Sequence, residues 1–171
     1  MKKMLFLFLW TFPVFAGQTE VYFTPSPDCE NHIIKRIEET QNTIDAAVYS
    51  ITNNAITKAL IDAHNRGVKI RILTDRTQAG NKSSTVKELE STGIDLIRHR
   101  KYKIQHDKFA VFDGKKGVTG SYNWTNAATY KNAENCLFFE DSSVQKYEKR
   151  FEDLWQLNKE AYRKKALKDR Q

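Results

Sequence analysis

The chain has 171 residues, which is enough for one domain with a substantial core and too few for two domains of ordinary size. Hydrophobic residues make up 40% and charged residues 29%, so the composition excludes a disordered chain, a collagen-like chain and a bundle of membrane spans. The formal net charge of +7 includes basic clusters at 98–103 and 163–170, of which the second is interpreted as a solvated helix end.

The N-terminal residues 1–16 are expected to form a signal peptide. Two lysines supply a positive start, an apolar run follows, and Val14-Phe15-Ala16 fits the small-x-small rule for signal peptidase. The apolar run is shorter than the roughly twenty residues that a spanning helix needs. We therefore expect cleavage near Ala16, secretion across the inner membrane to the periplasm or the medium, and a mature domain at 17–171. Retention of the segment as a membrane anchor is the alternative.

Strand and helix patterns alternate through the first half of the mature chain. The helix expected at 53–66 has Ile56, Leu60 and Ile61 at helical spacing and ends at Gly67. In chain order we expect a strand at 20–24, a helix at 28–40, a strand at 43–50, the helix at 53–66, a strand at 68–74, a helix at 83–92 and a strand at 94–98.

The second half is richer in strands. Two strands at 108–112 and 117–119 are expected to form a hairpin across Asp113-Gly114, since this dipeptide favours a tight turn. A strand at 134–139 and a helix at 144–157 follow. Helices between strands imply crossover units that cover both faces of a sheet. The predicted fold class is α/β, an α/β/α sandwich on a mixed β-sheet.

The two cysteines, Cys29 and Cys136, are not spaced as a metal site. They could pair in an oxidising compartment. Because Cys136 lies in a strand pattern where buried free thiols are common, the sequence favours unpaired thiols and leaves the disulfide open.

The sequence offers no familiar metal or nucleophile motif among its histidines and serines. It contains no HExxH or HxH, no GxSxG elbow and no GxxxxGK[ST] phosphate loop. His32 and His64 are interpreted as structural residues on helices. We therefore expect no metal and no cofactor, and the chemistry is sought in the stretch 105–125.

That stretch contains the pattern HxKxxxxDxxxxxxGSxN, made by His106, Lys108, Asp113, Gly120, Ser121 and Asn123. The pattern resembles the signature of the phospholipase D superfamily, and the chain is similar to its small, secreted, single-motif members, the bacterial Nuc-type endonucleases. The likeness extends to Ala47–Ser50, to RGVKIRILTD at Arg66–Asp75 and to KNAEN at Lys131–Asn135.

The residue types of the motif suit a phosphate. Side chains two apart on a strand share a face, so His106 and Lys108 can meet one ligand. Lys108 offsets phosphate charge, Asn123 can donate a hydrogen bond, and Ser121 can orient a ring nitrogen or a phosphate oxygen. Gly120 allows a close approach of backbone or ligand. These residues form a phosphate cradle that contains a nucleophile.

The resemblance implies a two-step covalent reaction. His106 would attack phosphorus, and water would open the phosphohistidine. The second ring nitrogen of His106 needs an acceptor, and the resemblance assigns that role to Glu134. A solvated carboxylate at the end of a strand is the alternative for Glu134.

Asp113 is interpreted differently from the rest of the motif. It is a turn residue one strand length away from His106, so we expect a structural or dimer-contact role and no catalytic role. A single motif also lacks a second histidine to protonate the leaving oxygen. The sequence therefore predicts a two-fold homodimer with the active site at the interface.

Residues near the motif are candidates for contact with a polyanion. Basic side chains track a nucleic-acid backbone, and aromatic rings stack on bases. For Trp124, core packing is an equal alternative, and for the basic segment 98–103 the alternative is a solvated loop. The predicted substrate-binding residues are Arg98, Arg100, Lys101, Lys103, Tyr122 and Trp124.

The leading functional hypothesis is a metal-independent, sequence-nonspecific endonuclease that hydrolyses DNA, with RNA left open as a further substrate. The first alternative is a phospholipase D-type hydrolase that acts on a phospholipid such as cardiolipin, which would favour an apolar groove rim where the sequence predicts a basic, polar one. The second alternative is a catalytically silent nucleic-acid-binding protein. A histidine nucleophile would have no use in pure binding, which argues against it.

Overall fold

The structure, a computed structural model, describes residues 18–168, and the expected signal peptide lies outside them. Its centre is a seven-stranded mixed sheet with the order β1-β7-β6-β5-β2-β3-β4. The strands are β1 Thr19–Phe23, β2 Thr43–Val48, β3 Lys69–Asp75, β4 Asp95–His99, β5 Lys108–Phe112, β6 Lys116–Gly120 and β7 Asn135–Phe139. The strands β2, β3 and β4 are parallel, and β5, β6, β7 and β1 continue the sheet in antiparallel pairs.

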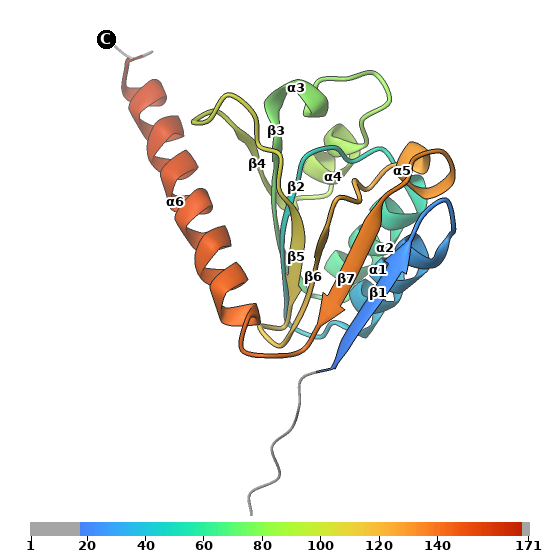
Figure 1. Cartoon of the computed structure of the whole chain (residues 1–171). Coiled ribbons are helices and arrows are strands. Elements are labelled where there is room, and N and C mark those ends of the chain that lie inside the picture. The colour runs from blue at the N-terminus through green and yellow to red at the C-terminus, as the bar shows by residue number, and fades with distance from the viewer. Residues whose placement is uncertain (1–17, 169–171) are drawn as a thin grey trace, which may run out of the picture.

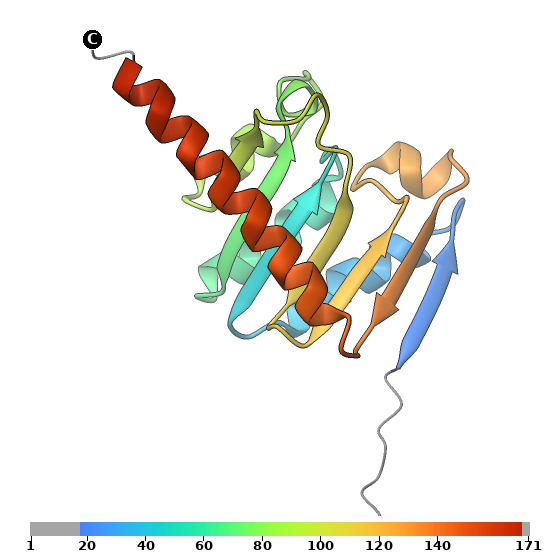
Figure 2. The same ribbon diagram turned by 60° about the vertical axis from the view of Figure 1, so that its left-hand side comes forward.

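Helices cover both faces of this sheet, which confirms the predicted α/β/α sandwich. The long helix α6 crosses one face, and α1, α2 and α4 lie on the other (Figures 1 and 2). The helices are α1 Asp28–Glu39, α2 Asn54–Asn65, α3 Arg76–Ala79, α4 Val86–Ser91, α5 Asn126–Tyr130 and α6 Val144–Lys168.

Alternation along the strands supplies the two halves of the core. On β2, Ile44, Ala46 and Val48 belong to the large cluster beneath α1 and α2. Ala47, between them, faces the opposite side and packs with Phe151 and other apolar residues of α6. Because successive side chains on a strand point to opposite faces, one central strand serves both layers.

The predicted helices differ from the observed ones in four places. The helix expected at 83–92 is shortened to α4, and α3 and α5 were not predicted. These two are so short that caps define them: Asp75 Oδ1 accepts from two backbone N–H groups of α3, and Thr125 Oγ1 accepts from Ala128 N of α5. The helix α6 runs past residue 157, where charged residues hide the apolar periodicity, and its end projects beyond the sheet (Figure 2).

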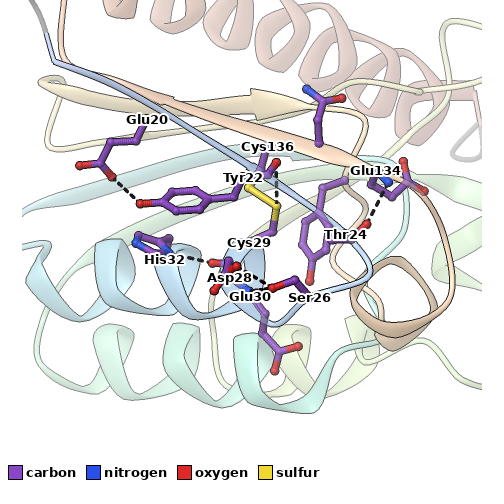
Figure 3. The surroundings of a disulfide bond; sticks show 12 residues. Glu20, Tyr22, Thr24, Ser26, Asp28, Cys29, Glu30, His32, Glu134 and Cys136 are labelled. Carbon is purple, nitrogen blue, oxygen red and sulfur yellow. Dashed lines mark hydrogen bonds between the residues drawn. A yellow bond between two sulfur atoms is a disulfide. The ribbon is translucent and has the colours of Figure 1, made fainter.

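A disulfide joins α1 to β7, so the sequence preference for unpaired thiols is wrong. The Cα atoms of Cys29 and Cys136 are 5.9 Å apart, and both residues are buried (Figure 3). The two cysteines are 107 positions apart in the chain. Only the packing of α1 against β7 brings them together, and the burial expected for Cys136 did not distinguish a thiol from a half-cystine.

The turn between β5 and β6 is held by Asp113. Its carboxylate accepts hydrogen bonds from the backbone N–H groups of Gln41, Asn42 and Thr43 at 2.9, 2.7 and 2.9 Å. Its own backbone is in the left-handed region, with φ 52°. Burial alone would raise the pKa of Asp113, but the backbone donors outweigh burial and lower it. The residue therefore fastens the β5–β6 turn to the segment that enters β2.

We predict that Asp113→Ala destabilises the fold by about 1–3 kcal/mol at neutral pH, because three backbone donors lose a charged acceptor. The depressed pKa means that this stabilisation is complete above the ordinary carboxyl pKa of 3.8 and is lost as the pH falls through the lower, folded-state value. Urea unfolding should show that the free energies of unfolding of Asp113→Ala and the unmodified protein differ less at pH 3 than at pH 7.

The matched control is Asp62→Ala. Asp62 lies in an exposed pair with Lys58 on α2, so its loss should change stability by no more than about 0.5 kcal/mol. Equal stability of Asp113→Ala and the unmodified protein at pH 7 would contradict the structural role.

Candidate active site

Six predicted motif and site residues line one open hollow at an end of the sheet. The hollow has a volume of about 380 Å³. Its walls come from the start of β5, the end of β6 and the loop that enters β7. The residues are His106, Lys108, Gly120, Ser121, Asn123 and Glu134.

Gly120 brings the last two strands of this site together. Its φ is +150°, and a Cβ atom at this position would lie 2.2 Å from the carbonyl oxygen of Asn135. That oxygen accepts hydrogen bonds from the backbone N–H groups of Ser121 and Tyr122, and Ser121 Oγ accepts from Asn135 N at 3.1 Å. Since Ser121 Oγ accepts this bond, its hydroxyl proton remains available to a ligand.

Lys108 and His106 form the opposite wall. The ammonium of Lys108 donates to the backbone oxygen of His106. Burial lowers the pKa of Lys108, and the negative charges of Asp107 and Glu134 partly oppose this effect. A partly desolvated ammonium gains more from an anionic ligand than an exposed lysine does. The side chain of His106 is exposed.

Glu134 lies in the hollow, but within residues 18–168 its carboxylate does not form the expected hydrogen bond with His106. The carboxylate accepts from Asn132 Nδ2 at 3.0 Å. Its backbone N–H donates to Thr24 Oγ1 at 2.9 Å, and its backbone oxygen accepts from Thr24 N at 3.0 Å (Figure 3). The loop before β7 is therefore bonded to the end of β1, and the Glu134 carboxylate is hydrogen-bonded to Asn132 of the same loop.

Asn123, which lines the hollow, has an unsatisfied polar atom. Its Oδ1 is buried and has no hydrogen-bond partner among residues 18–168, which destabilises the fold. Because Oδ1 can only accept, a hydrogen bond from Asn123 to a phosphoryl oxygen has to come from its Nδ2 amide. The adjoining backbone is fixed, because Trp124 N donates to Ser50 O at 3.1 Å.

The predicted stacking roles of Tyr122 and Trp124 are wrong. Both side chains are 2% exposed and belong to the large core. Tyr122 shares a 2.6 Å hydrogen bond with Thr129 Oγ1, and burial raises its pKa to about 12. Side chains alternate along this extended segment, so Ser121 and Asn123 face the hollow while the aromatic rings between them point into the core.

The basic segment that precedes His106 separates into engaged and free side chains. Arg98 is held by the Glu90 carboxylate through two bonds of 2.8 and 2.6 Å, and the Arg100 guanidinium lies 5.4 Å from the Tyr162 ring centre. Lys101 and Lys103 are exposed and make no hydrogen bond or ion pair within residues 18–168. These two lysines thus remain candidates for contact with an anion.

The same loop exposes two large hydrophobic side chains. Tyr102 and Ile104 are each 50% exposed and alternate with Lys101 and Lys103. The rim that the sequence predicted as basic and polar is therefore amphipathic.

Two further residues at this end of the sheet were not predicted. Tyr49, directly after β2, contacts His106 and Lys108. His99 is buried, and its Nε2 accepts from Tyr102 N at 2.7 Å. The only sequence signal for Tyr49 was its place in the strand end Ala47–Ser50, and His99 was hidden among the basic residues around it.

Neither a metal cluster nor a membrane span is found in the part of the chain that the structure describes. Within it, His, Cys, Asp and Glu residues form no group of three or more that could hold a metal ion. No helix there combines the length and the apolar character needed to cross a membrane.

The sheet, its helices and the hollow with its HxK and GSxN residues define a phospholipase D-like domain. The chain belongs to this family: the family profile described as "Cardiolipin synthase, PLD-like domain" matches residues 33–155.

Individual relatives agree with this assignment. The chain is 40% identical over 122 residues to a "Phospholipase D" of Rickettsia prowazekii (strain Madrid E), across 71% of this chain and 60% of that protein. It is 30% identical over 156 residues to a "Mitochondrial cardiolipin hydrolase" of Xenopus laevis, across 85% of this chain and 74% of that protein. The crystal structure of the phospholipase D family member Nuc from Salmonella typhimurium superposes with a TM-score of 0.78 at 28% identity, and the match covers 82% of this chain and 95% of Nuc.

We predict that His99 makes the fold sensitive to mild acid. Burial lowers its pKa from 6.5, and this effect exceeds the opposing charges of Asp75 and Asp107, while Arg150 lowers the pKa further. The unfolded chain therefore binds a proton first as the pH falls, so stability should be complete above about pH 6.5 and decline below it.

Thermal unfolding between pH 7.5 and 5 tests this prediction, with His99→Gln beside the unmodified protein. The variant should be less stable at pH 7.5 but should lose less of its stability with acid. Parallel pH curves for the two proteins would contradict the prediction. His32→Gln is the control, because His32 is only half-buried, on α1.

Proposed function

We propose that the chain is a phosphodiesterase that hydrolyses phosphodiester bonds of DNA, and of RNA in addition, without sequence preference and without a metal ion. The observation that carries this proposal is the convergence of the HxK and GSxN residues and Glu134 on one hollow. The likeness to Nuc supports a nucleic-acid substrate. The exposed lysines at 101 and 103 suit its backbone.

In the proposed reaction, an imidazole nitrogen of His106 attacks phosphorus and the bond to the leaving oxygen breaks. Lys108, Asn123 and the Ser121 hydroxyl face the phosphoryl oxygens and stabilise their charge. A second acid protonates the leaving oxygen. Water then attacks the phosphohistidine, which frees His106 and leaves a phosphomonoester.

The second acid is proposed to be His106 of a second copy in a two-fold homodimer. One sheet face supports this arrangement. On the side of α6, the helix leaves β7 and β1 uncovered (Figure 2). Tyr22 packs against the large core cluster on the other side, so its neighbours Val21 and Phe23 point to the α6 side, where they are 45% and 68% exposed. Phe23 pairs with Asn135, next to Glu134, so this apolar face reaches the end of the sheet that carries the hollow.

The disulfide supports an extracytoplasmic location. Such bonds persist in oxidising compartments, and the expected signal peptide would deliver the chain to one. We therefore propose that the protein acts in the periplasm or outside the cell.

A phospholipid such as cardiolipin is the second candidate substrate. It is favoured by the amphipathic loop beside His106, where Tyr102 and Ile104 are half exposed between lysines. Such a loop suits a lipid surface with anionic headgroups. The named cardiolipin hydrolase among the relatives points the same way.

We predict that the protein cleaves plasmid, single-stranded DNA and RNA in the presence of EDTA. Replacing the nucleophile should be severe, so His106→Ala should lose at least about 10³-fold in rate. His64→Ala is the matched control, because His64 lies on α2 and lines a different hollow. Cleavage is followed on gels, beside turnover of cardiolipin vesicles.

The outcomes separate the hypotheses. Lipid turnover without cleavage of nucleic acid would replace the first substrate by the second. Binding of DNA without any His106-dependent turnover would indicate a silent binding protein and reject the enzymatic proposal.

We predict that the protein sediments as a dimer and that Phe23→Asp yields a folded, inactive monomer, because a carboxylate on the apolar face opposes association. The rate should depend on pH as a bell, since one His106 must be neutral and the other protonated. Tyr130→Asp, which alters an exposed aromatic on α5, is the control. A fully active monomer would reject the shared site.

A further inference from the structure

Tyr49 contacts the two motif residues that the proposed reaction uses most. Its ring centre is 4.6 Å from that of His106, with an angle of 57° between the planes. The Lys108 ammonium lies 4.9 Å from the centre of the same ring. One aromatic side chain therefore touches both the proposed nucleophile and the principal cation of the hollow.

The ring contact matters because His106 has few other constraints. Within residues 18–168, neither ring nitrogen of His106 makes a hydrogen bond, and the expected bond to Glu134 is not formed. An exposed histidine normally samples several rotamers. In this site, the face of the Tyr49 ring limits the orientations that the imidazole can adopt.

The contact with Lys108 has a different physical basis. A cation over an aromatic face is attracted by the ring quadrupole. The ring holds the ammonium without a counter-charge, whereas a carboxylate in the same place would compete with an anionic substrate. The charge of Lys108 is thereby kept available to a phosphate.

Tyr49 is itself fixed from two directions. Its hydroxyl accepts a hydrogen bond from Gln78 Nε2 at 2.9 Å, and Gln78 Oε1 accepts from Asn81 Nδ2 at 3.0 Å, which orients the amide. Its backbone N–H donates to Asp107 O at 3.0 Å, between the two motif residues. The ring is therefore anchored to α3 and to the start of β5.

The same anchor reaches the segment before His106. Asp75 caps α3, which carries Gln78, through Oδ1, and its Oδ2 accepts from Gln105 N at 3.2 Å. One buried carboxylate thus fixes both the helix that holds Tyr49 and the residue next to the nucleophile.

We propose that Tyr49 is a positioning residue, whose ring orients the His106 imidazole and holds the Lys108 ammonium in the hollow. This role rests on the proposed phosphodiesterase function. It explains why the unpredicted helix α3 stands beside the site: α3 supplies the Gln78 amide that holds the phenol.

The kinetic test compares Tyr49→Leu with Tyr49→Phe. Loss of the ring should lower kcat by about 10- to 100-fold with KM within about twofold, since misplaced reactive groups cost rate more than binding. The phenylalanine variant keeps the ring and should recover most of the lost rate. Gln78→Leu removes the hydrogen bond to the Tyr49 hydroxyl and keeps the ring, so it should lower kcat by a smaller factor of about 2 to 5. This variant replaces Tyr49→Leu as the test if Tyr49→Leu does not fold.

A second readout needs no activity. The ring current of Tyr49 shifts the carbon-bound protons of His106, so their NMR resonances should move in Tyr49→Leu and stay near their original positions in Tyr49→Phe. Tyr22→Leu is the matched control, because Tyr22 also stacks on a histidine, His32, with ring centres 3.9 Å apart. Tyr22 lies on β1, an edge strand that three strands separate from β2. This variant should move His32 and leave both His106 and kcat unchanged.

The outcomes distinguish this proposal from the function on which it rests. Absence of turnover in the unmodified protein would reject the function, and the NMR shifts would still test the placement of His106. Unchanged kcat in folded Tyr49→Leu, or His106 resonances that do not respond to loss of the ring, would overturn the positioning role.

Discussion

The register of three antiparallel strands determines where every proposed reactive group lies. Phe109 pairs with Thr119, which places Lys108 beside Gly120, and Gly120 in turn pairs with Cys136 on β7. The absence of a side chain at Gly120 allows β7 to approach so closely that one carbonyl accepts two backbone N–H groups. A shift of one residue would turn the lysine to the other face of the sheet and would dismantle the hollow.

Much of this arrangement could be predicted because it depends on short-range periodicity. Strands with apolar alternation and helices with a broad apolar stripe gave the sandwich, and the HxK and GSxN spacing indicated which side chains share a wall. The same rule of alternation, applied one residue further, places Tyr122 and Trp124 in the core. The stacking roles predicted for both rings are wrong because the alternation that turns Ser121 and Asn123 to the hollow turns the rings to the core, which was the alternative for Trp124.

Other features depend on tertiary contacts that no local pattern records. The short helices α3 and α5 are defined by single capping side chains, the Cys29–Cys136 bond by the docking of α1, and the role of Tyr49 by a helix elsewhere in the chain. Asp113 shows the converse case. Its turn chemistry was readable from the sequence, but its partners at 41–43 became visible only when β2 and β5 were paired.

The disulfide has a consequence for resistance to proteolysis. The cross-link between Cys29 and Cys136 closes a covalent ring, and every residue that lines the hollow lies within it. A protease that cuts one exposed loop inside this ring opens the chain but releases no fragment, because the two pieces stay joined through sulfur. A single cut in a loop between Cys29 and Cys136 would therefore leave the residues that line the hollow covalently connected, so the domain can remain folded.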